Sequence, residues 1–236
     1  MLILATDTSS KHGSLALVRG DRQHVEVLEV VPLVGGTFSA QLIPQVAALL
    51  NRHHLRKEEL DALAATTGPG SFTGLRVGLA GVKALAEVLG KPIAAVSVLE
   101  AVAASSGLEG RVLASLDAGR NEVFAGEYAV KGNLVHRLSE SLLSREDFLA
   151  HVRGAVHATR VVTPDAPLAE FLRSHGLESL VLDRPRADVI ARLGLRKLLA
   201  GDTVSVEQLD ANYLRRSDAE IFSLPKIAGS TAKSEN

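Results

Sequence analysis

The sequence predicts an α/β protein built from two similar lobes, and two observations lead to this fold class. First, three short apolar or alternating segments separated by turn residues open each half of the chain, and a helical pattern follows them. Second, the first predicted strand of each half ends in an aspartate, Asp7 in one half and Asp117 in the other. We therefore expect a mixed sheet in each lobe, led by an antiparallel three-strand meander.

The first lobe is predicted over residues 1–106, and the period of its apolar residues defines its elements. Pro44 lies inside the first helical pattern and predicts either a later helix start or an early kink. Gly90 is a typical terminator of the second helix. In chain order the elements are strands at 2–7, 13–18 and 25–31, a helix at 42–50, a strand at 61–67, a helix at 73–89, a strand at 93–96 and a helix at 99–104.

The second, smaller lobe is predicted over residues 107–222, and the polar residues 223–236 are predicted to form a disordered tail. Its pattern repeats the order of the first lobe. The elements are strands at 111–117, 122–130 and 134–139, a helix at 145–152, a strand at 160–163, a helix at 166–175, a strand at 180–182 and a helix at 187–200.

Composition excludes several classes of protein. The 236 residues include 26 basic and 27 acidic side chains, and a net charge of -1 predicts no avid binding of RNA by this chain alone. The absence of cysteine excludes disulfides, thiolate metal sites and a cysteine nucleophile. The N-terminal run is too short for a signal peptide, and no segment reaches the ~20 apolar residues of a membrane span. We expect a cytoplasmic protein without a membrane partner.

Gly68, Gly70 and Gly74 form the most distinctive turn in the chain. Their spacing differs from the dinucleotide fingerprint, no Lys-Ser or Lys-Thr pair follows as in a Walker A loop, and Ser71 is not centred in a nucleophile elbow. The turn is either a plain tight turn or a place where backbone N–H groups at a helix N-terminus hold an anion.

The helix after this turn carries two stripes. One is apolar, and the other, one position earlier on the helix, consists of glycines at 74, 78 and 81. Each interior glycine costs the helix roughly 1 kcal/mol relative to alanine, so the glycine stripe indicates a close approach of other atoms. Those atoms belong either to the core of this chain or to another subunit.

Three strings of residues, at 2–9, 68–78 and 96–99, together resemble the TsaB family, also called YeaZ. Similar residues at Asp117, Glu122 and Tyr213 extend the resemblance over most of residues 1–216. The resemblance implies an actin/hexokinase/Hsp70-like (ASKHA) fold, in which each of the two lobes is ribonuclease-H-like. This agrees with the duplicated order of strands and helices.

The resemblance also implies a function. TsaB proteins are non-catalytic subunits of the complex that makes N6-threonylcarbamoyladenosine beside the anticodon of tRNA. The implied partners are the catalytic paralogue TsaD, the ATPase TsaE and, in their absence, a second copy of the chain; tRNA is met only through the complex. No tightly bound cofactor is expected, although a nucleotide at the interface with TsaD is an open expectation. The residues implied for the subunit interface are Leu42, Val46, Leu49, Gly74, Gly78, Gly81, Val82 and Leu85.

A second group of residues is a candidate anion or nucleotide loop. Kinases of this fold place carboxylates at the positions of Asp7 and Asp117, near a magnesium-bound nucleotide; the alternative is that both aspartates cap turns at strand ends. The whole group is Asp7, Thr8, Ser9, Gly68, Gly70, Ser71 and Asp117. The alternative function is accordingly a small actin-fold phosphotransferase or a peptidase.

The histidines argue against catalysis by this chain. TsaD binds its metal with two histidines four residues apart, and none of the eight histidines here has that spacing. We therefore expect no metal site and no catalytic residues. Two positions depart from the family pattern, because Phe38 stands where relatives often carry histidine and Gly119 stands where many carry arginine.

Overall fold

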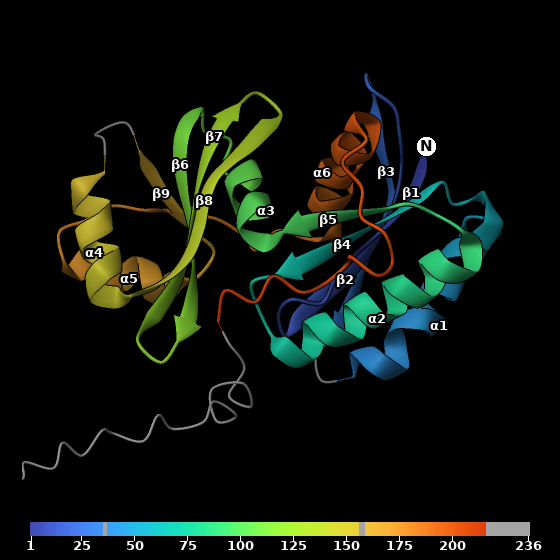
Figure 1. Ribbon diagram of the computed structural model, residues 1–236, viewed down its shortest axis with the longest axis horizontal. Coiled ribbons are helices and arrows are strands. Elements are labelled where there is room, and N and C mark those ends of the chain that lie inside the picture. Colours follow the sequence, from blue (N-terminus) through green and yellow to red (C-terminus); the bar gives the residue numbers. More distant parts are fainter. Residues whose placement is uncertain (35–36, 156–158, 216–236) are drawn as a thin grey trace, which may run out of the picture.

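The computed structural model describes residues 1–34, 37–155 and 159–215. The tail predicted at residues 223–236 lies outside these residues, as does the end of the second predicted lobe, 216–222. Figure 1 shows two sheets facing each other across a central pair of helices, with another pair of helices on the outside of each sheet. None of the helices in the described ranges is both long and apolar enough to span a membrane.

The first sheet has five strands in the order β3-β2-β1-β4-β5. Strands β1, β2 and β3 pair antiparallel, and β4 and β5 continue the sheet in parallel from β1. Their bounds are β1 Leu2–Asp7, β2 His12–Gly20, β3 Val25–Val34, β4 Ala62–Gly68 and β5 Ile93–Ser97. Every residue of β1 and β4 is buried, as expected for central strands covered on both faces.

The second sheet repeats this topology, with the order β8-β7-β6-β9-β10 when it is followed from the same edge. Its strands are β6 Gly110–Gly119, β7 Glu122–Lys131, β8 Leu134–Ser144, β9 Arg160–Thr163 and β10 Leu180–Val181. Both sheets are thus mixed and begin with an antiparallel meander, which confirms the fold class predicted from the sequence. Strand β8 is longer than predicted, because its pairing with β7 continues as far as Ser144.

The helices also follow the predicted order, and a single turn of 3-10 helix at Lys57–Glu59 was not predicted. Helix α1 begins before Pro44 and continues past it, so the proline does not delay the helix start. The bounds are α1 Phe38–Arg52, α2 Phe72–Leu89, α3 Val98–Ser105, α4 Arg145–Gly154, α5 Ala166–Ser174 and α6 Ala187–Ala200.

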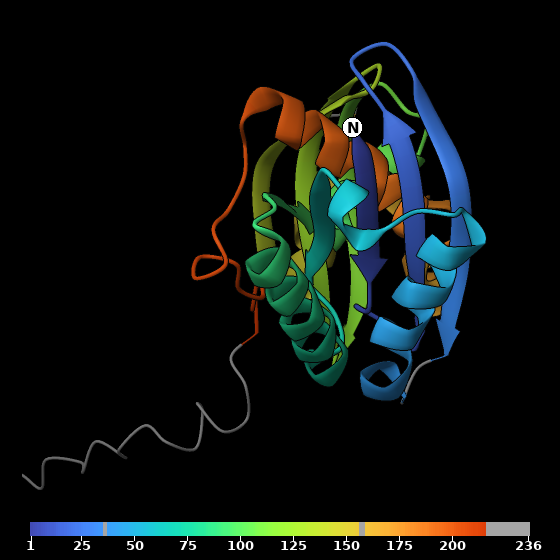
Figure 2. The ribbon, with the colours of Figure 1, turned by 90° about the vertical axis from the view of Figure 1, so that its right-hand side faces the viewer.

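The two central helices are exchanged between the halves of the chain. Helix α3 comes from the first half, yet its apolar face packs with β6 and β7 of the second sheet. Helix α6 comes from the second half and packs on the first sheet, where Gly194 lets the helix approach Ala64 closely. The outer helices stay with their own sheets: α1 and α2 cover the first, and α4 and α5 cover the second (Figures 1 and 2). Because of this exchange, the division at residue 106 remains a prediction.

Residues 209–215, which we call the C-terminal strap, connect the two lobes across their junction. Leu209 is buried in the core of the first lobe, and the Asn212 N–H donates to the Thr67 carbonyl oxygen at 2.6 Å. The Asn212 side chain donates to Glu140 of β8 at 2.7 Å, and Arg215 donates to the Ala118 carbonyl oxygen at 2.9 Å. The strap therefore hydrogen-bonds both lobes within four residues.

Candidate functional site

The loop after β1 packs against the glycine turn that leads into α2. Asp7 is buried at the end of β1, where its Oδ1 accepts hydrogen bonds from the Ser9 N–H and from Thr66 Oγ1, each at 2.9 Å. Burial raises the pKa of Asp7, and these two donors oppose the rise. The Ser9 hydroxyl also acts to lower this pKa, although its geometry falls short of a hydrogen bond. The carboxylate of Asp7 thus caps the turn, one of the two roles left open by the sequence.

The glycine turn uses its own polar groups to bind this loop. Gly68 has φ 111°, a conformation that favours glycine, and a Cβ on Gly70 would overlap the Ser9 carbonyl oxygen. That oxygen accepts a hydrogen bond of 2.7 Å from the Ser71 N–H. Ser71 Oγ accepts from the Gly74 N–H at 3.2 Å and so caps α2. The amide and the hydroxyl of Ser71 are therefore both engaged within the chain.

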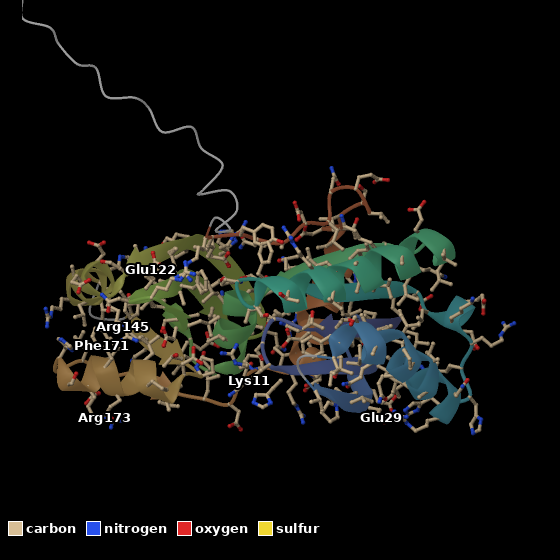
Figure 3. The ribbon with its side chains drawn as sticks, turned by 90° about the horizontal axis from the view of Figure 1, so that it is seen from below. Lys11, Glu29, Glu122, Arg145, Phe171 and Arg173 are labelled. Carbon is tan, nitrogen blue, oxygen red and sulfur yellow. The ribbon has the colours of Figure 1, made fainter. Side chains whose placement is uncertain are left out.

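Asp117 occupies the corresponding place in the second lobe. Its Oδ1 accepts from the Gly119 N–H at 2.9 Å, which is the same two-residue turn that Asp7 caps. Its Oδ2 lies 3.5 Å from Arg145 Nη2, and the Arg145 guanidinium lies over the ring of Phe171 at 4.7 Å (Figure 3). Asp117 is thus both a turn cap and one member of an ion pair.

A cavity of about 700 Å³ lies where the glycine turn, the β6–β7 hairpin and the C-terminal strap meet. Four of the seven residues predicted for the anion loop line it, namely Ser9, Gly70, Ser71 and Asp117. The other three are buried next to those residues and do not line the cavity: Asp7, Thr8 and Gly68. Only one of the two predicted aspartates therefore faces the space between the lobes.

Sequence reasoning missed the most organised group in this cavity. Arg76, on the second turn of α2, donates from Nε to the hydroxyl of Tyr213 at 3.1 Å, and its guanidinium lies 3.7 Å from the ring centre of Phe72. The rings of Phe72 and Tyr213 are 5.2 Å apart. Arg76 belongs to the glycine string used for the resemblance, but no sequence signal links it to Tyr213, which lies 137 positions away.

The glycine stripe of α2 packs within this chain. A Cβ on Gly74 would overlap the Thr8 carbonyl oxygen, one on Gly78 would overlap the Thr8 side chain, and one on Gly81 would lie 2.5 Å from Leu42 Cδ2. The stripe therefore lets the loop after β1, at Thr8, and helix α1 approach α2, which is the first of the two alternatives posed by the sequence.

This packing buries most of the residues predicted for the interface. Gly81 and Leu85 are half-buried and remain partly accessible, but the other six residues are buried in the chain itself: Leu42, Val46, Leu49, Gly74, Gly78 and Val82. The apolar period marks the face of each helix that meets the sheet, and this face is closed to a partner. A surface on these helices must consist of other residues.

The outer surface of α1 and α2 supplies such residues. On α2, Ala80, Ala84 and Val88 are exposed and lie on one stripe four residues apart, and Val88 is 76% exposed. On α1, Ile43 and Ala47 have the same spacing, and Ile43 is 47% exposed. Ile43 Cδ1 lies near Gly81 of α2, so the two stripes adjoin where the helices pack together (Figure 2). We call these five residues the α1–α2 outer face.

Metal ligands are not gathered in the part of the chain that the structure describes. No three histidine, aspartate or glutamate side chains there lie close enough together to hold a metal ion. Ser71, the serine of the glycine turn, hydrogen-bonds Gly74 rather than a histidine. The cavity thus presents arginines, aromatic rings and one carboxylate.

The fold and this site define a class of protein. Two sheets of identical topology, joined at a cavity beside a glycine turn, are the two ribonuclease-H-like lobes of the actin/hexokinase class. Two solved structures share this arrangement. YeaZ from Pseudomonas aeruginosa superimposes with a TM-score of 0.72 at 26% identity, covering 89% of this chain and 100% of that one. A protein described as similar to peptidase YeaZ from Pseudomonas aeruginosa superimposes with a TM-score of 0.69 at 29% identity, covering 91% of this chain and 99% of that one.

Sequence comparisons give the family. The model of TsaD, tRNA N6-adenosine threonylcarbamoyltransferase, matches residues 27–171. The tRNA threonylcarbamoyladenosine biosynthesis protein TsaB of Bacillus subtilis is 30% identical over 228 residues, which are 93% of this chain and 96% of that protein. TsaB of Escherichia coli is 28% identical over 230 residues, with the same coverage. The chain belongs to the TsaB family.

Proposed function

We propose that this chain works in the biosynthesis of threonylcarbamoyladenosine in tRNA as a non-catalytic subunit that supports a TsaD-type transferase in the cytoplasm. Membership of the TsaB family supports the pathway, since relatives aligned over nearly their whole length carry that name. The observation that carries the subunit role is the α1–α2 outer face, an exposed apolar surface on two adjacent helices.

The proposed occupant of this face is the TsaD paralogue. The TsaD model matches a part of this chain that includes both α1 and α2, so the transferase is expected to have helices of the same kind. Two related lobes can pair through equivalent surfaces about an approximate two-fold axis. The same geometry permits pairing with a second copy of this chain when TsaD is absent. TsaE and tRNA are proposed to join the complex that TsaD forms.

The structure offers less support for a catalytic role of this chain. In a phosphotransferase, the aspartates at the lobe junction would face the nucleotide, but Asp7 is turned into the core and Asp117 is paired with Arg145. In a serine peptidase, the serine needs a base within hydrogen-bond reach, and Ser71 caps α2 instead. We therefore keep the peptidase and the phosphotransferase as the alternatives that the following experiment tests.

Ala84→Arg tests the proposed surface, because it places a long charged side chain on the α1–α2 outer face. We expect this variant to bind TsaD from the same organism at least ten times more weakly, as measured by calorimetry, and to lose activity when TsaD, TsaE and tRNA are added. Ala150→Arg is the matched control, since Ala150 is an exposed helical alanine on α4.

Wild-type affinity of Ala84→Arg for TsaD would contradict the proposed surface. Light scattering adds a second reading: loss of self-association with retained TsaD binding would assign the face to the homodimer alone. Formation of threonylcarbamoyladenosine by this chain without TsaD would contradict the non-catalytic role.

A further inference from the structure

Helix α6, which lies between the two sheets (Figure 1), carries two arginines one turn apart, Arg192 and Arg196. The helix packs on the face of the first sheet opposite to α1 and α2, so the pair belongs to a different surface from the α1–α2 outer face. Neither arginine lines the cavity beside the glycine turn. Their role is therefore separate from that of both features.

The environment of this pair differs from that of the other half-buried arginines. Five arginines of the described residues are half-buried, and three of them have a carboxylate partner: Arg145 with Asp117, Arg184 with Asp165 and Arg215 with Glu122. The remaining two are Arg192 and Arg196. Within the described residues, no carboxylate lies within 4.0 Å of either guanidinium group. Two partly desolvated positive charges thus stand together without an acidic partner.

Carboxylates on the adjoining segments are engaged elsewhere. Asp188 stands one turn before Arg192 on the same stripe of α6, but its Oδ1 lies 3.5 Å from Arg186 Nε. Glu109, beside the hairpin that joins β7 and β8, accepts a hydrogen bond of 2.8 Å from the Gly132 N–H. Neither carboxylate therefore forms an ion pair with the two arginines.

The proximity of the two guanidinium groups is unfavourable for the protein alone. Side chains four residues apart on a helix have Cβ atoms about 5–6 Å apart, and like charges at this spacing destabilise the helix. Burial, and after it the charge of Arg192, lowers the pKa of Arg196. A positive charge near the C-terminus of a helix is favourable, but this accounts for neither the burial nor the pairing. An anion held by both groups would remove the repulsion.

The two side chains are also arranged to donate hydrogen bonds. Arg196 Nη1 donates to the Asn133 carbonyl oxygen in the hairpin between β7 and β8, which holds this guanidinium in position. Arg192 makes no hydrogen bond or ion pair with another described residue, so its N–H groups are available. A guanidinium group donates two parallel hydrogen bonds to a phosphate or a carboxylate. A carboxylate has only two oxygens, whereas a phosphate group has enough oxygens for both arginines.

We propose that Arg192 and Arg196 together bind a phosphate group, carried either by a free phosphate compound or by the backbone of a nucleic acid. Both sources present the same chemistry to the pair, namely negatively charged oxygens around one phosphorus atom. The site requires no metal ion, because its positive charge comes from side chains. This binding is additional to the subunit role, since α6 packs on the opposite face of the first sheet from α1 and α2.

Calorimetry of the whole chain with pyrophosphate, in EDTA and at low salt, tests the proposal. We expect a Kd below about 1 mM, and Arg192→Gln and Arg196→Gln should each weaken binding about tenfold or more. Arg153→Gln is the matched control, because Arg153 is an exposed helical arginine on α4 whose Nη2 donates to the His175 carbonyl oxygen at 3.4 Å. Arg192→Gln removes no hydrogen bond between described residues, so the unfolding temperature without ligand should not fall.

Titration with oligouridylate distinguishes the two sources of the phosphate group. If the site takes a nucleic-acid backbone, each of the two substitutions should reduce the slope of log K against log salt by about 0.7. Binding of pyrophosphate without binding of the RNA would assign the site to a free phosphate compound. Either result supports the proposed pair.

The proposal is overturned if neither pyrophosphate nor oligouridylate binds at millimolar concentration, or if Arg192→Gln and Arg196→Gln bind both probes like the wild type. It is also overturned if Arg153→Gln weakens binding as much as they do, because the effect would then reflect net charge alone. None of these outcomes bears on TsaD binding, which Ala84→Arg tests separately.

Discussion

At the scale of single residues, Asp7 shows how the first strand of the lobe is joined to the rest of the site. Its carboxylate is buried, and its Oδ1 accepts hydrogen bonds from Ser9 of the following loop and from Thr66 of β4. Burial is the largest influence on its ionisation and raises the pKa. A carboxylate in this position caps the turn, but its ionised form is buried and therefore lowers the stability of the folded protein.

Stability should therefore depend on the ionisation of Asp7. Its pKa is raised in the native state, so the native protein binds the proton more tightly than the unfolded chain does. As the pH rises from about 3.9, the pKa of an unfolded aspartate, through the higher native pKa, this residue should lower the free energy of unfolding. Above the native pKa of Asp7, the whole of this reduction in the free energy of unfolding persists.

Urea unfolding at a series of pH values checks this expectation. Asp7→Asn should remove the decline that Asp7 causes over this window, whereas Asp183→Asn, at an exposed aspartate, should leave the wild-type profile unchanged. Parallel profiles for Asp7→Asn and the wild type would show that burial of this carboxylate does not govern stability.

At the scale of elements, α2 presents three distinct faces. The apolar stripe meets the first sheet, the glycine stripe meets Thr8 and Leu42, and the α1–α2 outer face is exposed. The same helix begins beside the cavity and carries Arg76 on its second turn. One element therefore connects the core, the cavity and the proposed partner surface.

The glycine stripe gives a prediction about α2. In Gly74→Ala the new Cβ would overlap the Thr8 carbonyl oxygen, which is part of the backbone and cannot rotate away. We expect the free energy of unfolding to fall by about 2 kcal/mol, although alanine is the better helix former. Gly154→Ala at the end of α4 is the control, because among the described residues, apart from its chain neighbours and the backbone of its own helix, no atom lies within 4 Å of its Cβ position. Urea denaturation compares the variants, and wild-type stability for Gly74→Ala would mean that the approach of Thr8 is not close.

At the scale of the whole molecule, the exchange of α3 and α6 and the C-terminal strap join the two lobes. The strap contributes a polar connection in which Glu140, whose side chain is 4% exposed, accepts hydrogen bonds from Asn212 and from Tyr128. Burial, together with the neighbouring carboxylate, raises the pKa of Tyr128 and keeps its hydroxyl a donor. The angle between the lobes, and with it the width of the cavity, should depend on this connection.

Asn212→Ala tests this dependence by removing one donor to a buried carboxylate. We expect a loss of about 1–3 kcal/mol in the free energy of unfolding and a broader distribution of distances between the lobes. The chain has no cysteine, so spin labels attach only to the cysteines introduced at Lys57 in the first lobe and Lys131 in the second. The distance between these two labels reports the distance between the lobes. Asn51→Ala, at an exposed position on α1, should change neither quantity. An unchanged distance distribution in Asn212→Ala would mean that α3 and α6, rather than the C-terminal strap, set the angle between the lobes.

The sequence by itself determined the order of the elements, because the periods of 2 and 3.6 residues and the turn residues are local properties. Strand β1 and helix α6 even have the predicted bounds. The sequence also identified the glycine turn and the family. Periodicity located the apolar stripe of α2, and the family resemblance placed Val82 of this stripe at the subunit interface, although Val82 is buried in the fold. A buried face and a docking face have the same apolar composition, so the stripe alone does not distinguish them.

Only the tertiary structure decided which residues from distant parts of the sequence come into contact. It turned Asp7 into the core, set Gly74 and Gly78 against Thr8, and left Ala84 and Val88 on the surface. It also brought Tyr213 to Arg76 across 137 positions of the chain. Such contacts depend on how sheets and helices pack together, and no local period of the sequence encodes which surfaces of two distant elements will face each other.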